Sequence, residues 1–116
     1  MNILLKPLHL ACPLLLVTGC APLPTKQASD RSLALAQGAC GGCHAVERYG
    51  VSPNPIAPPF AAIVNQQGLT RETLGTWLRD AHNYPEEMDF YLRDNEVEML
   101  VDHMLTLRDP AYRPAI

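Results

Sequence analysis

The sequence predicts an all-α protein with three main helices. Three segments of the 116-residue chain, at 30–40, 70–81 and 94–108, carry apolar residues at helical spacing. The chain has no long Val- and Ile-rich alternating run of the kind that strands need. The connection at 45–68 is rich in proline, which excludes a regular helix or a central strand from much of that stretch.

The first helix is expected to begin near Ser29 or Asp30, because both residues are good N-caps. It should run into Cys40 and end at Gly41 and Gly42, which favour a break in the helix. Its apolar positions are Leu33, Leu35, Ala36 and Ala39.

The proline-rich connection should be a loop that contains one short helix, from Phe60 to Asn65. Its prolines are Pro53, Pro55, Pro58 and Pro59. The second main helix is expected to begin at Thr70, a good N-cap, and to end near Ala81. Its apolar face consists of Leu74, Trp77 and Leu78.

The third main helix is expected to begin at Asp94 and to end near Arg108, just before Asp109-Pro110. Met99 lies off its apolar stripe and is expected to be exposed. Residues 109–116 should form an irregular tail. The apolar stripe consists of Val97, Leu100, Val101, Met104 and Leu105.

The N-terminus has the pattern of an export signal. Lys6 supplies a positive charge, and the apolar stretch 8–17 is too short to span a bilayer, which needs about 20 residues. The stretch ends in Val17-Thr18-Gly19-Cys20, which resembles the lipobox of bacterial lipoproteins. We therefore expect residues 1–19 to be a signal peptide and Cys20 to be lipidated. An ordinary cleaved signal peptide, followed by an unmodified cysteine, is the alternative.

The mature chain, residues 20–116, should form one small domain at 30–108 behind a flexible tether at 20–29. Loss of Lys6 leaves 8 of the 9 basic residues against 12 acidic ones, a net charge of −4, which argues against a nucleic-acid partner. By resemblance to lipoproteins, Ala21 in place of aspartate favours the outer over the inner membrane, with the domain on the periplasmic side.

The motif Cys40-Gly41-Gly42-Cys43-His44 is the attachment pattern of c-type haem. Each thiol adds to one haem vinyl group, and the adjacent histidine becomes the proximal ligand of the iron. The motif predicts one covalent haem c, held by Cys40 and Cys43, with His44 bound to iron.

Three other interpretations of this motif remain open. A Cys-x-x-Cys can be a thioredoxin-type redox pair, but no βαβ pattern surrounds it here. It can be half of a zinc site, but His82 and His103 lie 21 residues apart and supply no second ligand pair at regular spacing. A structural disulfide is the third.

Together with the helices and the export signal, two segments resemble class I c-type cytochromes, and specifically small bacterial monohaem ones. These segments are Cys40 to Val46 and Ser52 to Phe60, and the likeness covers about residues 30–108. The resemblance implies a cytochrome c fold, in which the first and last helices cross beside the haem. It also implies that a proline carbonyl accepts a hydrogen bond from His44. Pro58 is the best match, although stiffening of the loop would also explain any one of these prolines.

The resemblance places the distal iron ligand at Met88, in the loop six residues before Asp94. The family usually has proline after this methionine, whereas this chain has Asp89, so the loop is expected to be less rigid. His82 is the alternative distal ligand. Met104 is expected in the core.

Two further residues have interpretations from the family. His103 occupies a position where the family often has an aromatic residue, and it should pack near Gly38 without binding iron. Trp77 could reach a haem propionate, but core packing is the stronger expectation.

The implied function is one-electron transfer between membrane-associated redox proteins in the periplasm, with no small-molecule substrate and no catalysis. The acidic group Glu86, Glu87 and Asp89 would favour a basic protein partner. Two alternatives remain: a haem with an open sixth position that binds ligands or peroxide, and an electron-relay subunit of a larger dehydrogenase or oxidase.

Overall fold

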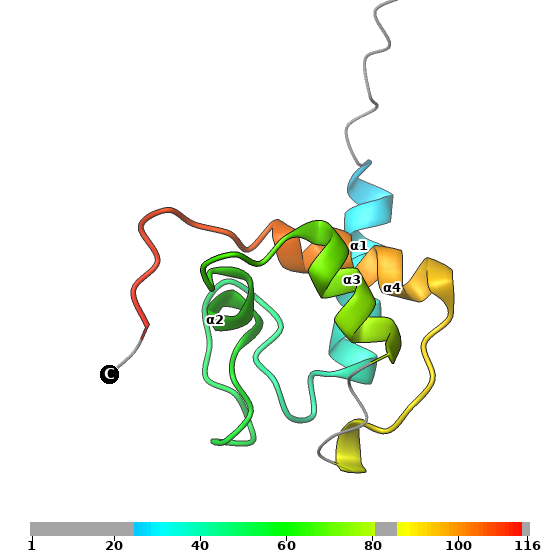
Figure 1. Cartoon of the computed structure of the whole chain (residues 1–116), viewed down its shortest axis with the longest axis horizontal. Coiled ribbons are helices and arrows are strands. Elements are labelled where there is room, and N and C mark those ends of the chain that lie inside the picture. The colour runs from blue at the N-terminus through cyan, green and yellow to red at the C-terminus, as the bar shows by residue number, and fades with distance from the viewer. Residues whose placement is uncertain (1–24, 81–85, 115–116) are drawn as a thin grey trace, which may run out of the picture.

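The structure is a computed structural model that describes residues 25–80 and 86–114, apart from the side chain of Glu87. These residues form four α-helices and one 3-10 helix, and they contain no strand, so the predicted all-α class is confirmed for them (Figure 1). The elements are α1 (Lys26–Ala39), α2 (Phe60–Val64), α3 (Arg71–Asp80), η1 (Glu86–Met88) and α4 (Asp94–Leu105).

Several predictions from the sequence fall outside the described residues. They are the signal peptide at 1–19, the lipidation of Cys20, the first part of the tether, and His82. Within the described residues, no helix combines the length and the apolar character needed to cross a bilayer.

Helix α1 begins earlier than its sequence suggested. The N-cap is Thr25, whose hydroxyl accepts a hydrogen bond from the Ala28 amide at 3.3 Å, so the prediction of Ser29 or Asp30 as the cap is wrong. The intervening residues Lys-Gln-Ala are good helix formers, which lets the helix extend back to Thr25. Residues 26–29, predicted to belong to the flexible tether, are therefore helical.

Helices α2 and α3 lie within a residue of their predicted bounds. Thr70 caps α3 as predicted, since its hydroxyl accepts from the Thr73 amide at 3.2 Å and the Thr73 hydroxyl accepts from the Thr70 amide at 2.9 Å. This exchange satisfies two amide groups at the start of the helix.

Helix α4 begins at Asp94 as predicted but ends at Leu105, before the predicted Arg108. Hydrogen bonds between the end of this segment and residues 64–69 cause the earlier end. The Arg108 guanidinium donates to the carbonyls of Val64, at 3.1 Å, and Leu69, and the Asn65 side chain accepts from the Asp109 amide at 2.9 Å. These bonds turn the chain away from the helix axis and attach it to the end of α2.

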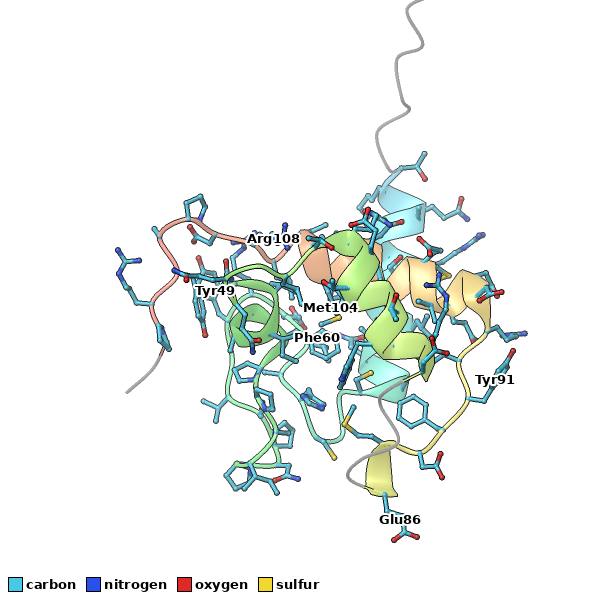
Figure 2. All side chains as sticks on the ribbon, in the orientation of Figure 1. Tyr49, Phe60, Glu86, Tyr91, Met104 and Arg108 are labelled. Carbon is cyan, nitrogen blue, oxygen red and sulfur yellow. The ribbon has the colours of Figure 1, made fainter. Side chains whose placement is uncertain are left out.

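Helix α4 is the centre of the fold, because α1, α2 and α3 all pack against it. Figure 1 shows α1 and α4 crossing steeply. The apolar stripe predicted for α4 supplies most of the fully buried side chains, including Met104 at 1% exposure, which Figure 2 shows inside the bundle. The core consists of Ala36, Val46, Phe60, Val64, Leu74, Leu78, Leu92, Val97, Leu100, Val101, Met104 and Leu107.

Two expectations about single side chains are wrong. Trp77 is 37% exposed instead of packed in the core. Met99 is half-buried instead of exposed. Both deviations lie at the margins of helix faces, where a helical pattern does not determine how far a neighbouring element covers a side chain.

The outer faces of α3 and α4 are joined by a set of exposed ion pairs. Arg71 bonds to Asp102 and, at 3.1 Å, to Glu98. Arg79 bonds to Glu98 at 2.6 Å and to Asp94 at 3.3 Å. Each arginine therefore connects the two helices at two points.

Candidate functional site

Residues 40–44 form a tight turn that continues from the end of α1. The Cys40 carbonyl accepts from the amides of both Cys43, at 3.1 Å, and His44, at 2.9 Å. The turn is fastened to the helix through the Gly41 amide, which donates to the carbonyls of Ala36 and Gln37 at 3.0 and 3.1 Å. The two cysteines and the histidine therefore all lie on one compact turn.

The two thiols are free and differ in environment. Cys40 is half-buried and packs against the hydrophobic core, whereas Cys43 is exposed. Burial, and secondly the neighbouring Cys43, raise the pKa of the Cys40 thiol to about 11. Cys40 is therefore a neutral thiol at physiological pH.

His44 is held by the carbonyl that the family resemblance assigned to it. Its Nδ1 lies 2.7 Å from the Pro58 carbonyl oxygen, so the predicted contact is present. Because a carbonyl oxygen can only accept, Nδ1 carries the proton, and Nε2 of the neutral imidazole keeps its lone pair. The ring also lies against buried Phe60, with centroids 5.6 Å apart.

The loop from Ser52 to Phe60 holds the backbone of the motif on its other side. The Ser52 hydroxyl accepts from the Ala45 amide at 3.1 Å, and the Asn54 amide donates to the Cys43 carbonyl at 3.1 Å. The Phe60 amide donates to the Ala45 carbonyl at 2.9 Å. Residues 43–45 are thus fixed by the proline-rich loop as well as by the turn.

Met88 lies on a different element, at the end of η1, and its side chain is half-buried. Phe90 packs against the core and Leu92 belongs to it, so the chain after η1 is fixed to the bundle. Both η1 and the end of α1 lie towards the lower edge of the molecule in Figure 1. No hydrogen bond or ring contact within the described residues joins Met88 to the 40–44 turn.

The acidic side chains beside Met88 that the structure describes are exposed. Glu86 and Asp89 both face solvent, and Figure 2 shows Glu86 projecting from η1. The Asp89 amide donates to the Glu86 carbonyl at 3.0 Å, which closes the 3-10 turn. Both charges are therefore available to a partner surface.

The structure gives His103 a hydrogen-bond partner, while its packing near Gly38 stays a prediction. The His103 Nε2 lies 2.7 Å from the Val46 carbonyl oxygen. A Cβ atom placed on Gly38 would meet no heavy atom within 4 Å, so no close approach requires glycine there. Among the described residues, no three His, Cys, Asp or Glu side chains lie close enough together to hold a metal ion.

The donor set on the 40–44 turn fits a covalently attached haem. It supplies two unpaired thiols and one imidazole whose Nδ1 is protonated and whose Nε2 can bind a metal. Two open hollows in the described part, of about 330 and 410 Å³, lie beside His44 and between α2 and the tail. Neither is lined by both His44 and Met88.

Comparisons with protein-family models, curated proteins and solved structures find no match to this chain.

Sequence reasoning did not single out the supporting residues of the site. Ser52 and Asn54 each precede a proline, a pattern that marks turns, but nothing in it identifies the backbone groups they contact. The partner of His103 lies 57 positions away along the chain, beyond the reach of any local pattern.

Proposed function

We propose that this chain is a monohaem c-type cytochrome of class I that transfers single electrons between protein partners. The observation that carries the proposal is the hydrogen bond of His44: Nδ1 donates to the Pro58 carbonyl, which leaves Nε2 available to bind a metal on the same turn as two free thiols. A redox dithiol or a disulfide would need the cysteines but would give no reason for the adjacent, oriented imidazole.

The residues of the turn have separate tasks in this proposal. Cys40 and Cys43 hold the haem through thioethers, each formed when the S–H adds across a vinyl C=C bond without net oxidation or reduction. His44 Nε2 binds the iron, while the Pro58 carbonyl fixes its tautomer and increases its basicity. When bound, haem supplies a one-electron couple at its iron.

Met88 is the proposed distal ligand. A thioether sulfur favours the reduced iron and closes the sixth position to small ligands, which suits a carrier better than a catalyst. The half-burial of Met88, and the attachment of the following chain to the core at Leu92, support a fixed sulfur position. Exposed Glu86 and Asp89 beside it support a basic partner surface.

Export and lipidation at Cys20 complete the proposal and rest on the sequence pattern. Because α1 begins at Lys26, only residues 21–25 separate Cys20 from the helix, and these reach at most about 20 Å. A lipid on Cys20 would therefore keep the domain beside the bilayer, on the periplasmic side. In cell fractionation, Cys20→Ser should release the protein from the membrane fraction into the soluble periplasm.

Visible spectra with and without carbon monoxide test the distal ligand. We expect the parent to show an Fe–S charge-transfer band when oxidised and no carbon monoxide adduct when reduced. Met88→Ala should lose the band and bind carbon monoxide. The matched control is Met99→Ala, which removes another half-buried methionine and should behave as the parent.

Two results would redirect the proposal. Ready binding of carbon monoxide by the parent would favour a haem with an open sixth position. A parent spectrum that lacks the Fe–S band, and changes in His82→Ala but not in Met88→Ala, would assign the distal ligand to His82.

A further inference from the structure

The chain just after the 40–44 turn is fastened to the end of α4 by two reciprocal bonds. His103 on α4 donates through Nε2 to the Val46 carbonyl at 2.7 Å. In the opposite direction, the Arg48 guanidinium donates to the Thr106 carbonyl, the C-cap of α4, at 2.6 Å. Arg48 also pairs with Asp109 at 3.8 Å. Residues 46–48 therefore cannot move without disturbing α4.

The bond from His103 is the closer of the two to His44. Val46 lies two residues after His44, and its side chain is buried in the core at 6% exposure. Between them, Ala45 is held by Ser52 and Phe60. Among the hydrogen bonds to Ala45 and Val46 described here, the bond from His103 is the one that comes from α4. It therefore links the backbone next to His44 to the central helix.

Without this bond, the backbone near His44 would be held only by the hydrogen bonds of the 40–44 turn and of the proline-rich loop, and its nearest link to α4 would be the bond of Arg48. The His44 ring is held at Nδ1 by Pro58, a residue of that same loop. A shift of the Val46 peptide would then alter the angle between the ring and the Pro58 carbonyl. A weaker bond at Nδ1 makes the imidazole a less basic ligand, which favours the reduced iron.

We propose that His103 is a positioning residue for His44, acting through its hydrogen bond to the Val46 carbonyl. This role deepens the proposed haem function and rests on it. The hydrogen bond of the His103 ring goes to the backbone of Val46, two residues after His44. It acts by holding the peptide chain that carries the proximal ligand.

The test compares the haem-loaded parent with His103→Phe and His103→Gln. Phenylalanine keeps an aromatic ring for packing but has no donor, whereas glutamine keeps an N–H that can reach the carbonyl. The matched control is Arg71→Gln, which breaks ion pairs between α3 and α4 without touching residues 43–48. The measurements are the midpoint potential, the paramagnetic resonance spectrum of the oxidised protein and the thermal midpoint.

In His103→Phe we expect the ratio of reduced to oxidised protein at a fixed ambient potential to rise about threefold. For a one-electron couple this is a shift of about +28 mV. The resonance spectrum should change as well, because it responds to the orientation of the coordinated ring. His103→Gln should recover most of both shifts, and Arg71→Gln should lower only the thermal midpoint.

Three outcomes overturn the role of His103. In the first, His103→Phe has the same midpoint potential and the same paramagnetic resonance spectrum as the parent. Another is a change in His103→Gln as large as in His103→Phe, which would show that the donor is not what matters. The third is an equal change in Arg71→Gln. If His103→Phe does not fold, His103→Met is measured in its place against the same criteria.

The same measurements distinguish a failure of the proposed function from a failure of the role of His103. A parent chain that carries no covalent haem refutes the proposed function and this role together. A parent with haem and normal electron exchange, combined with any of the three outcomes above, refutes only the role of His103.

Discussion

Gly41 and Gly42 are adjacent in the motif, yet the structure requires glycine at only one of them. A Cβ atom on Gly41 would lie 2.5 Å from the Gln37 carbonyl oxygen and 3.1 Å from its Cα. A Cβ atom on Gly42 would meet nothing within 4 Å, and neither glycine has a positive φ. Gly41→Ala should therefore destabilise the protein, and Gly42→Ala should not.

The magnitude follows from the contact. Ordinary contacts of a Cβ atom begin near 3.4 Å, so the Gly41→Ala turn must open by about 1 Å against backbone atoms. Overpacking of this kind costs about 1–3 kcal/mol, of which the smaller entropy of the unfolded alanine chain offsets about 0.4–1 kcal/mol. At Gly42 only the entropic gain remains. The two variants should differ in the free energy of unfolding by about 2 kcal/mol.

Denaturant unfolding of the two variants and the parent, prepared under the same conditions, measures this difference directly. The yield of covalent haem is a second readout, because opening the turn displaces Cys40 and the bonds that the Gly41 amide makes to α1. Equal stability and equal haem yield in Gly41→Ala and Gly42→Ala would refute the geometry described for the turn.

Three further variants test the fold around the site. Met104→Ala leaves a cavity at the centre of the bundle and should cost about 2–5 kcal/mol in denaturant unfolding, and a loss below 1 kcal/mol would contradict the burial of Met104. Arg71→Gln should cost about 1 kcal/mol or less, and the loss should shrink in high salt because the ion pairs are exposed; a loss that salt does not alter would show that they contribute little. The Arg93 guanidinium, and secondly the Arg93 amide, hold the pKa of the Glu96 carboxyl below its ordinary value of 4.5. The ionised carboxylate therefore contributes its full stabilisation of the folded state above about pH 4.5. This stabilisation is lost as the pH falls through the lower pKa that Glu96 has in the folded protein. Glu96→Gln should therefore lose less stability than the parent on acidification from pH 7 to pH 3, and identical acid profiles would contradict the bond to Arg93.

The local parts of the fold could be predicted from the sequence because they depend on near neighbours. The stripe on α4 and the Thr70 cap each involve residues three or four positions apart, and both agree with the structure. The predicted start of α1, at Ser29 or Asp30, is wrong because the helix extends back beyond both residues to Thr25. The helix propensity of the residues after Thr25 determines where this helix begins, and the presence of a single good capping residue does not.

The parts that could not be predicted depend on contacts between distant segments. The end of α4 is set by Arg108 bonding to carbonyls near residue 64, and the role of His103 depends on Val46, 57 positions away. Pro58 is an intermediate case. Four prolines compete in its loop, and the family pattern selected the one whose carbonyl contacts His44, which periodicity alone could not do.

The most direct test of the account is the mass of the purified, exported protein after denaturation. We expect a mass increase of one haem on the polypeptide, which is retained when the protein is unfolded. The Cys40→Ala, Cys43→Ala double variant should carry no covalent haem, while Gly42→Ala, on the same turn, should carry as much as the parent. A parent chain without added haem, or with a Cys40–Cys43 disulfide in its place, would contradict the proposal that this turn exists to hold an iron porphyrin.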